Sequence, residues 1–435
     1  MAHVFESLCA EIAAVGVVTP IGRVVEVARG TLRVAGLHAI ARQGDRVEID
    51  GRLGGEVLTL SRDGATILAD GPVDGLAIGC EVALTGAAGI APDNSWIGRI
   101  IDPYGRPMDG RALFRGPVMR PLQAEAPAAA LRRRMGERIS TGVAVFDTLL
   151  PLVRGQRIGL FAGSGVGKSS LLAKFALGVD ADVVVIALVG ERGRELREFV
   201  ERVLGPAGMA RSVLVTATSD QSALARRRCA QAAMTVAEHF RAQGLHVLYL
   251  ADSITRFAEA HREVALASGE SAALRGYPPS VAQAIMSLAE RAGPGPEGEG
   301  DITAVFSVLV AGSDMEETIA DILRGVLDGH VVMDRKIAER GRYPAIDLLR
   351  SVSRSLPEAA SAEENALIAR SRQLLGAWDR AEMMIQAGLY AKGSDPLVDA
   401  AIKVWPALDG FLSEDAPAEG IAGSFARLSA ALSVR

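Results

Sequence analysis

Residues 158–169 read Ile158-Gly-Leu-Phe161, followed directly by Ala162-Gly-Ser-Gly-Val-Gly-Lys-Ser169. The apolar run predicts a buried strand, and the residues after the glycines predict a helix. A strand–loop–helix of this kind places successive backbone N–H groups and a helix N-terminus around one anion. At the first loop position Ala162 stands where the usual pattern has glycine. The alternative, a glycine-rich turn beside a chance Lys-Ser pair, leaves the flanking strand and helix unexplained.

The loop and the first helical turn therefore predict a site for the phosphates of a nucleotide. Lys168 brings a positive charge toward the outer phosphates, and the hydroxyl of Ser169 is placed to ligate Mg²⁺. The residues expected to surround the nucleotide here are Gly163, Ser164, Gly165, Val166, Gly167, Lys168, Ser169 and Ser170.

Composition narrows the class of protein. The chain has 435 residues, 49% of them hydrophobic and only 4% aromatic, which is typical of an α/β protein of two or three domains built on small side chains. Its net charge of −5 excludes the overall basic field that drives non-specific nucleic-acid binding. Three widely spaced cysteines, Cys9, Cys80 and Cys229, favour reduced thiols. With no signal peptide and no stretch near the roughly 20 apolar residues of a membrane span, we expect a soluble, cytoplasmic protein.

Changes in the pattern of apolar residues and glycines divide the chain into four segments, residues 1–17, 18–90, 91–355 and 356–435. The first carries the helical stripe Phe5, Leu8 and Ile12. Short β runs broken by glycines in the second predict a small β-barrel. Strands alternate with helices in the third, which predicts a doubly wound, mainly parallel sheet. The fourth is expected to be helical, mainly over 362–388 and 395–412.

Within the third segment the expected strands span 157–161, 183–189, 213–216, 246–251 and 303–310, and the expected helices begin near 168, 194, 221 and 279. Residues 98–110 are turn-rich and are expected to connect the barrel to the sheet. Residues 292–300, rich in glycine and proline, are expected to form an exposed loop. The arginine runs at 132–134 and 226–228 are interpreted as solvated helix faces.

Two acidic residues follow two of these strands. Glu191 lies just after strand 183–189, and Asp252 follows strand 246–251. Because ligands of an open parallel sheet lie beyond the carboxyl ends of its strands, both should lie at the edge that carries the phosphate loop. A carboxylate at Glu191 can orient and polarise the water that attacks a γ-phosphate; a helix cap or a surface charge is the alternative. Asp252 is expected to hold Mg²⁺, directly or through water.

Several motifs together resemble the rotary-ATPase catalytic subunit superfamily: Gly190-Glu-Arg-Gly-Arg-Glu195, Ala251-Asp-Ser-Ile-Thr-Arg-Phe-Ala258, Arg275-Gly-Tyr-Pro-Pro-Ser280, Tyr343-Pro-Ala-Ile-Asp347 and Ser351-Val-Ser-Arg354. The phosphate loop, Leu327-Asp-Gly-His330 and Gly388-Leu-Tyr-Ala-Lys-Gly-Ser-Asp-Pro396 resemble its flagellar branch, the flagellum-specific ATP synthases of type III protein export. Nearly the whole chain is covered. The resemblance implies an α/β protein with an N-terminal β-barrel, a central RecA-like phosphate-loop domain and a C-terminal helical domain.

The resemblance also implies ATP and Mg²⁺ as ligands. Lys168 and Ser169 match the lysine that contacts the phosphates and the hydroxyl that binds the metal. Glu191 matches the catalytic carboxylate, and Asp252 matches the acid of the metal site.

Three further residues acquire roles from the same resemblance. Arg192 resembles a second charge that contacts the phosphates. Tyr343 matches the aromatic residue that stacks on adenine, with an ordinary half-buried tyrosine as the alternative. Arg354 matches the arginine finger that reaches the nucleotide of a neighbouring subunit, which makes assembly a condition for activity.

The same resemblance also implies an oligomeric assembly and a cellular location. The chain is expected to form a homohexamer in the cytoplasm, peripheral to the inner membrane at the flagellar base, where it hydrolyses ATP to energise or prime protein export. The implied partners are a dimeric negative regulator at the helix of residues 1–17, export chaperone–substrate complexes, a stalk protein and the export gate, and no nucleic acid. For the stripe of the N-terminal helix, packing on the chain's own barrel is the alternative.

Three other functions would use similar residues. The ATPase of a virulence-type III injectisome differs mainly in the phosphate loop, where Ala-Gly-Ser-Gly-Val favours the flagellar branch. An RNA translocase of the Rho type needs an RNA platform with stacked aromatics, and residues 18–90 contain no Phe, Trp or Tyr. A non-catalytic nucleotide-binding subunit is disfavoured by Glu191.

Overall fold

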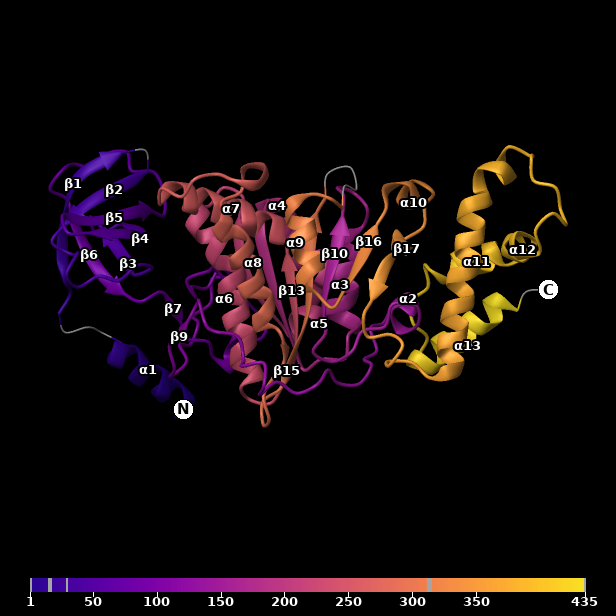
Figure 1. Ribbon diagram of the computed structural model, residues 1–435. Helices are drawn as coiled ribbons and strands as arrows, with labels where there is room; N and C mark the ends of the chain where they lie inside the picture. The colour runs from indigo at the N-terminus through magenta and orange to yellow at the C-terminus, as the bar shows by residue number, and fades with distance from the viewer. Residues whose placement is uncertain (1, 15–17, 29, 311–314, 434–435) are drawn as a thin grey trace.

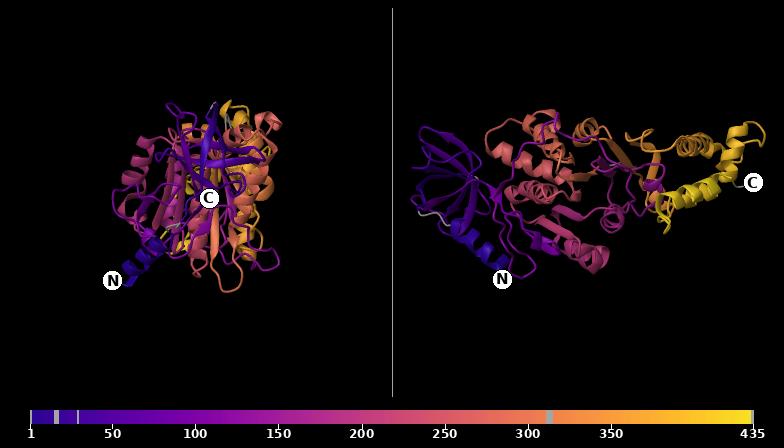
Figure 2. Two further views of the ribbon diagram at one scale, coloured as in Figure 1. Left: turned by 90° about the vertical axis from the view of Figure 1, so that its left-hand side faces the viewer. Right: turned by 90° about the horizontal axis from the view of Figure 1, so that it is seen from below.

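The computed structural model describes residues 2–14, 18–28, 30–310 and 315–433, and these form three parts in a row. A β-barrel lies at one end, a sheet covered by helices lies in the middle, and a group of helices lies at the other end (Figure 1). The view from below shows the same elongated arrangement (Figure 2). The fold class expected from the sequence is confirmed.

The barrel closes through the strand order β1-β2-β5-β4-β3-β6. These strands are β1 (Ile21–Ala28), β2 (Thr31–Ala35), β3 (Arg46–Ile49), β4 (Leu53–Ser61), β5 (Gly64–Ala69) and β6 (Glu81–Gly86). Alternate residues such as Leu32, Val34 and Ile67 fill the interior and are fully buried. Closure leaves the barrel without a free sheet edge.

The central sheet has nine strands in the order β17-β16-β10-β15-β13-β11-β12-β8, with β14 beside β15. Its strands are β8 (Arg99–Ile101), β10 (Arg157–Ala162), β11 (Val183–Glu191), β12 (Ser212–Thr218), β13 (His246–Asp252), β14 (Gly293–Pro294), β15 (Asp301–Leu309), β16 (Gly329–Met333) and β17 (Ile346–Ser353). The five strands expected from the sequence correspond to β10, β11, β12, β13 and β15. Most neighbours are parallel, whereas β14 and β17 run antiparallel to theirs.

Both faces of the sheet are covered, because successive side chains of a strand point to opposite sides. Ile158 and Leu160 share a core with helix 168–178 and the C-terminal helices. Val247 and Tyr249 share a second core with helices 223–241, 254–267 and 279–291. The helices of this part are α2 (Ala144–Asp147), α3 (Lys168–Gly178), α4 (Gly193–Glu198), a π-helical turn (Phe199–Leu204), α5 (Gly205–Met209), α6 (Ala223–Arg241), α7 (Ile254–Ala267), α8 (Pro279–Arg291), α9 (Thr318–Val326) and α10 (Arg335–Glu339).

Two segments expected as loops contribute strands to the sheet. Within residues 98–110, β8 forms the edge strand beside β12, so the segment does more than connect two parts. Within residues 292–300, β14 pairs with β15, and residues 292–295 are buried. Arg132 and Arg133 donate to carbonyl oxygens of this segment, at Ala292 and Gly295. Tertiary pairing overrides the local turn signals here.

The interpretation of the two arginine runs as solvated helix faces is wrong in part. Arg227 and Arg228 of α6 are buried, whereas Arg133 and Arg134 are exposed and lie outside any helix. Arg227 pairs with Glu56 of β4, and Arg228 lies over the ring of Tyr104, 4.8 Å from its centroid. These contacts join the barrel to the helices of the sheet.

The two ends of the chain are helical. At the C-terminus lie α11 (Ala362–Gln386) and α12 (Pro396–Phe411), both expected, and α13 (Gly420–Leu432), which lies in the segment expected to be helical although its range was not predicted. Trp378 and Trp405 stack between α11 and α12 with ring centroids 4.5 Å apart. At the N-terminus, α1 (Ala2–Ala14) lies beneath the barrel beside β7 (Gly89–Ile90) and β9 (Arg120–Pro121) (Figure 1). Across the described ranges, no helix has the length and apolar character needed to cross a membrane.

Candidate active site

The phosphate loop lies between the end of β10 and the start of α3, as the sequence predicts. Ala162 is the last residue of the strand, so alanine fits where the usual pattern has glycine. Gly165 and Gly167 have φ angles of 79° and 87°, a left-handed backbone that other residues rarely adopt. Val166 is buried in the core, so only its backbone can contribute to the loop. The remaining expected residues complete the loop and the first turn of α3: Gly163, Ser164, Lys168, Ser169 and Ser170.

Tyr343 lies beside this loop. A Cβ atom added to Gly167 would meet Cδ1 of the tyrosine ring at 3.0 Å, a second reason why only glycine fits there. Tyr343 is 50% exposed. It precedes β17, whose Ile346 pairs with Met333 at the end of β16 that adjoins the loop. The structure therefore presents an accessible aromatic ring next to the loop.

Lys168 and Asp252 form an ion pair behind the loop. Asp252 is the last residue of β13 and is 3% exposed. Its Oδ1 atom accepts from the Lys168 ammonium and also from the Ser307 hydroxyl of β15, at 2.7 Å. Among the described residues, none donates to its other oxygen, Oδ2.

Glu191 is the last residue of β11 and lies further along the strand direction than Asp252, beyond the end of β13. Leu188 pairs with Asp252, whereas Glu191 pairs with Thr218 after a register shift. Gly190 makes this shift with a φ of 71°. Burial, together with the nearby Asp252 carboxylate, raises the pKa of Glu191 to about 7, although the Lys168 ammonium opposes the shift. A carboxylate with such a pKa is suited to accept a proton near neutral pH.

The two predicted arginines lie in different places. Arg192 adjoins Glu191 at the start of α4, and its exposed guanidinium lies 3.7 Å from the Glu195 carboxylate. Arg354 follows the far end of β17, where Ser353 pairs with Gly329. The eight residues of β17, with a rise of about 3.3 Å per step, place the two ends of that strand about 23 Å apart. Arg354 is therefore remote from its own phosphate loop, and its exposed guanidinium donates to the Arg324 carbonyl oxygen at 3.3 Å.

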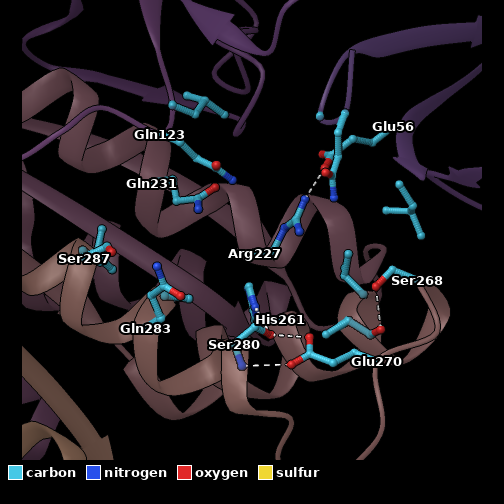
Figure 3. Close-up of a pocket in the computed structure, with 18 of the residues that line it drawn as sticks. Glu56, Gln123, Arg227, Gln231, His261, Ser268, Glu270, Ser280, Gln283 and Ser287 are labelled. Carbon is cyan, nitrogen blue, oxygen red and sulfur yellow. Dashed lines mark hydrogen bonds and ion pairs between the residues drawn. The ribbon is translucent and has the colours of Figure 1, made fainter. Parts of the chain in front are cut away.

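A separate cavity of about 740 Å³ lies between the barrel and helices α6, α7 and α8 (Figure 3). Amide and hydroxyl groups line it, including those of Gln123, Gln231, Gln283 and Ser287. Glu270 accepts hydrogen bonds from the backbone and hydroxyl of Ser280 at 3.0 and 2.6 Å, which fixes the start of α8. None of the predicted nucleotide-site residues is among the described residues that line this cavity.

Sequence reasoning missed Ser307. A signal is present, since Ser307 is the one hydroxyl in the apolar run Ala304-Val-Phe-Ser-Val-Leu309. The sequence does not state that β15 lies beside β13, and that neighbourhood is what brings the hydroxyl to Asp252.

A phosphate loop with two carboxylates at adjacent strand ends, one titrating near neutrality, defines a phosphate-loop nucleoside triphosphatase. Protein-family models match three consecutive parts of the chain: the ATP synthase alpha/beta family β-barrel domain at 17–86, its nucleotide-binding domain at 142–353, and the T3SS EscN ATPase C-terminal domain at 360–419. The chain belongs to the ATP synthase alpha/beta family and is an ATP hydrolase.

Full-length relatives agree with this. The chain is 44% identical over 421 residues to a flagellum-specific ATP synthase of Caulobacter vibrioides, covering 94% of this chain and 95% of that protein. It is 42% identical over 412 residues to a type 3 secretion system ATPase of Xanthomonas euvesicatoria, covering 93% and 92%. The expected resemblance to flagellum-specific ATP synthases is confirmed.

Solved structures agree as well. The assembled ATPase EscN of the enteropathogenic E. coli type III secretion system superposes with a TM-score of 0.89 at 36% identity, covering 95% of this chain and all of that one. EscN in complex with its central stalk EscO superposes with a TM-score of 0.87, also at 36% identity and 95% coverage of this chain.

Proposed function

We propose that this protein hydrolyses ATP to energise or prime the export of flagellar proteins through the flagellar type III secretion apparatus. The observation that carries hydrolysis is the meeting of Lys168, Asp252 and Glu191 at one sheet edge, with the pKa of Glu191 raised to about 7. The relative from Caulobacter vibrioides supports the flagellar assignment. The test is deletion of the gene, which should abolish flagellar filaments until the intact gene is restored. Normal filaments in the deletion strain would contradict the assignment.

A second candidate is the ATPase of a virulence-type injectisome. Type 3 secretion system ATPases match at 42% identity, close to the flagellar relatives. The same deletion strain separates the two functions, since an injectisome ATPase would be needed for effector secretion and not for filaments.

Each site residue takes a role in this proposal. Lys168 leaves Asp252 to bind the outer phosphates, and Glu191 orients the attacking water and accepts its proton. Tyr343 stacks on the adenine, which its exposed ring beside the loop allows. Arg192 adds a positive charge to the phosphates from the same sheet edge.

The residues present fit a Mg²⁺ ion. Asp252 offers a buried carboxylate with one oxygen held by two donors and Oδ2 without a donor among the described residues. Ser169 offers a hydroxyl on the first turn of α3. Oxygen donors of this kind are those that Mg²⁺ prefers in combination with phosphates and water. When bound, the ion would neutralise charge on the phosphates.

We further propose that the active form is a homohexamer. Arg354 lies at the end of β17 away from its own loop, so it can complete the site only of another subunit. The structures of assembled EscN and of EscN with its stalk support an oligomer that binds a stalk protein. On this basis the protein acts in the cytoplasm at the membrane base of the flagellum, with export chaperone–substrate complexes and the export gate as its further partners.

The pH dependence of hydrolysis should follow Glu191. A protonated carboxyl cannot accept a proton, so kcat/KM should fall by about tenfold per pH unit below the raised pKa of about 7 and level off above it. The measurement is kcat/KM from pH 5.5 to 9 at saturating Mg²⁺. The Glu195 carboxyl helps to raise this pKa, so Glu195→Gln should move the midpoint to lower pH without changing the titration of ATP itself. A profile that stays flat across pH 7 would remove Glu191 as the base.

The N-terminal helix should bind a dimeric regulator. Phe5, Leu8 and Ile12 are 68%, 50% and 65% exposed, which leaves much of their apolar surface available to a partner. The triple variant Phe5→Ala, Leu8→Ala, Ile12→Ala should keep the helix and abolish co-purification with the regulator, whereas Glu11→Ala on the same helix should not. Regulator binding that survives the triple variant would contradict this role.

A further inference from the structure

Ser307 holds the Asp252 carboxylate from inside the sheet. Ala251 of β13 pairs with Phe306 of β15, so Asp252 and Ser307 occupy the next positions along two adjacent parallel strands. Their side chains lie on the face that carries α3, and the Ser307 hydroxyl donates to Asp252 Oδ1 at 2.7 Å. Ser307 is fully buried, so its hydroxyl cannot turn to solvent.

Lys168 and Ser307 both donate to Asp252 Oδ1, but a bound nucleotide should affect the two hydrogen bonds differently. Lys168 begins α3 directly behind the phosphate loop, and phosphates bound there would compete with Asp252 for its ammonium. Within the described part of the chain, the Ser307 hydroxyl has Asp252 as its one hydrogen-bond partner. A buried hydroxyl without a partner is costly, so this bond should persist when Lys168 leaves.

We propose that Ser307 is a positioning residue for the metal site of this ATPase: it keeps Asp252 Oδ1 fixed after Lys168 has moved to the phosphates, which leaves Oδ2 free for the Mg²⁺ shell. The inference rests on the proposed role of Asp252 in binding Mg²⁺. The nearby buried hydroxyl of Thr255 serves the backbone instead: its Oγ1 accepts from the Leu309 amide at 2.9 Å and joins α7 to β15.

Two variants of equal shape test the hydroxyl alone. Ser307→Thr keeps the donor and Ser307→Val replaces it with a methyl group, so any strain from the added volume is common to both. The affinity for the non-hydrolysable analogue AMP-PNP is measured by calorimetry in excess Mg²⁺ and in excess EDTA. Ser307→Val should lose about 10- to 100-fold of the affinity gained from Mg²⁺, as is typical when a partner of a metal ligand is removed. Ser307→Thr should retain that gain, and in EDTA the two variants should agree within about twofold.

A second pair of variants controls for folding. Ser371 is a fully buried serine of α11 whose hydroxyl donates to the Leu367 carbonyl oxygen at 2.8 Å, far from Asp252 in the sequence and in the fold. Ser307→Ala should reproduce the loss of Mg²⁺-dependent affinity, and Ser371→Ala should not. These alanine variants decide the question if the valine variant fails to fold.

Either of two results would overturn the proposal: equal Mg²⁺-dependent affinity in the valine and threonine variants, or a valine variant that loses affinity equally in EDTA. Asp252→Asn distinguishes this failure from failure of the proposed function. If Asp252→Asn leaves the gain from Mg²⁺ unchanged, then Asp252 has no metal role and both proposals fall together. If it removes the gain while Ser307→Val does not, only the role of Ser307 is lost.

Discussion

Glu191→Gln should lower the turnover of ATP by about 10² to 10⁴ while ATP binding is retained. Glutamine has the shape of glutamate but no basic oxygen, so it can still occupy the end of β11 and cannot accept the proton of the attacking water. The strand pairing of Glu191 is with Thr218 of β12 and not with the phosphate loop, so the substitution should leave the loop in place. The measurement is steady-state hydrolysis, combined with equilibrium binding of ATP to the same preparation.

Lys168→Ala should have the effect on ATP binding that Glu191→Gln lacks. It removes the charge expected to contact the phosphates, so it should weaken ATP binding itself rather than turnover alone. Hydrolysis by Glu191→Gln at the wild-type rate would show that the base lies elsewhere.

Arg354→Ala should lower hydrolysis by about 10³ to 10⁵, the range for removal of an arginine finger. The reason lies in the two ends of β17: Tyr343 precedes the end beside the phosphate loop, and Arg354 follows the other end. One strand would thus contribute to two nucleotide sites of an oligomer. Arg354→Lys should recover only part of the activity, because an ammonium lacks the planar fork of guanidinium. Arg23→Ala, on the exposed surface of the barrel, should have no effect.

Mixing experiments test whether Arg354 acts on the nucleotide site of a neighbouring subunit. Subunits with Arg354→Ala and subunits with Glu191→Gln should each be nearly inactive alone, and a mixture should regain activity where an intact Glu191 meets an intact Arg354. The specific activity of the unmodified protein should also rise with concentration as subunits assemble. A rate per subunit that stays constant down to a demonstrated monomer, or mixed assemblies without recovery, would rule out the finger.

The strands with continuous apolar runs could be predicted from sequence because each is buried on both faces. Two short strands of the sheet could not. β8 is three residues long within a turn-rich segment, and β14 consists of Gly293 and Pro294, so neither has a local signal. Helix α7 was also missed, since it begins inside a motif interpreted for its chemistry; its cap, Ser253, accepts from the Arg256 amide and was a usable sign.

Part of the candidate site could likewise be predicted from the sequence and part could not. Lys168, Asp252 and Glu191 could be placed together because phosphate loops and strand-end acids follow a general rule of parallel sheets. The bond from Ser307 and the raised pKa of Glu191 could not, because both depend on which strands are neighbours and how deeply they lie. The roles of Arg192, Tyr343 and Arg354, and the boundaries of the four segments, stay predictions.

The contact of α6 with the barrel decides how the chain can be shortened for crystallisation or binding work. Glu56 supplies the partner of Arg227, so a fragment that starts after the barrel would strip a buried guanidinium of its carboxylate and expose Arg228 beside it. Such a fragment should be poorly soluble and prone to aggregate. Trimming α1 removes the hydrogen bond from the Arg115 amide to the Ser7 hydroxyl but leaves the Glu56–Arg227 pair in place. Shortened versions for crystallisation or nucleotide binding should therefore start just before β1 and keep the barrel, whereas work on the proposed regulator needs α1.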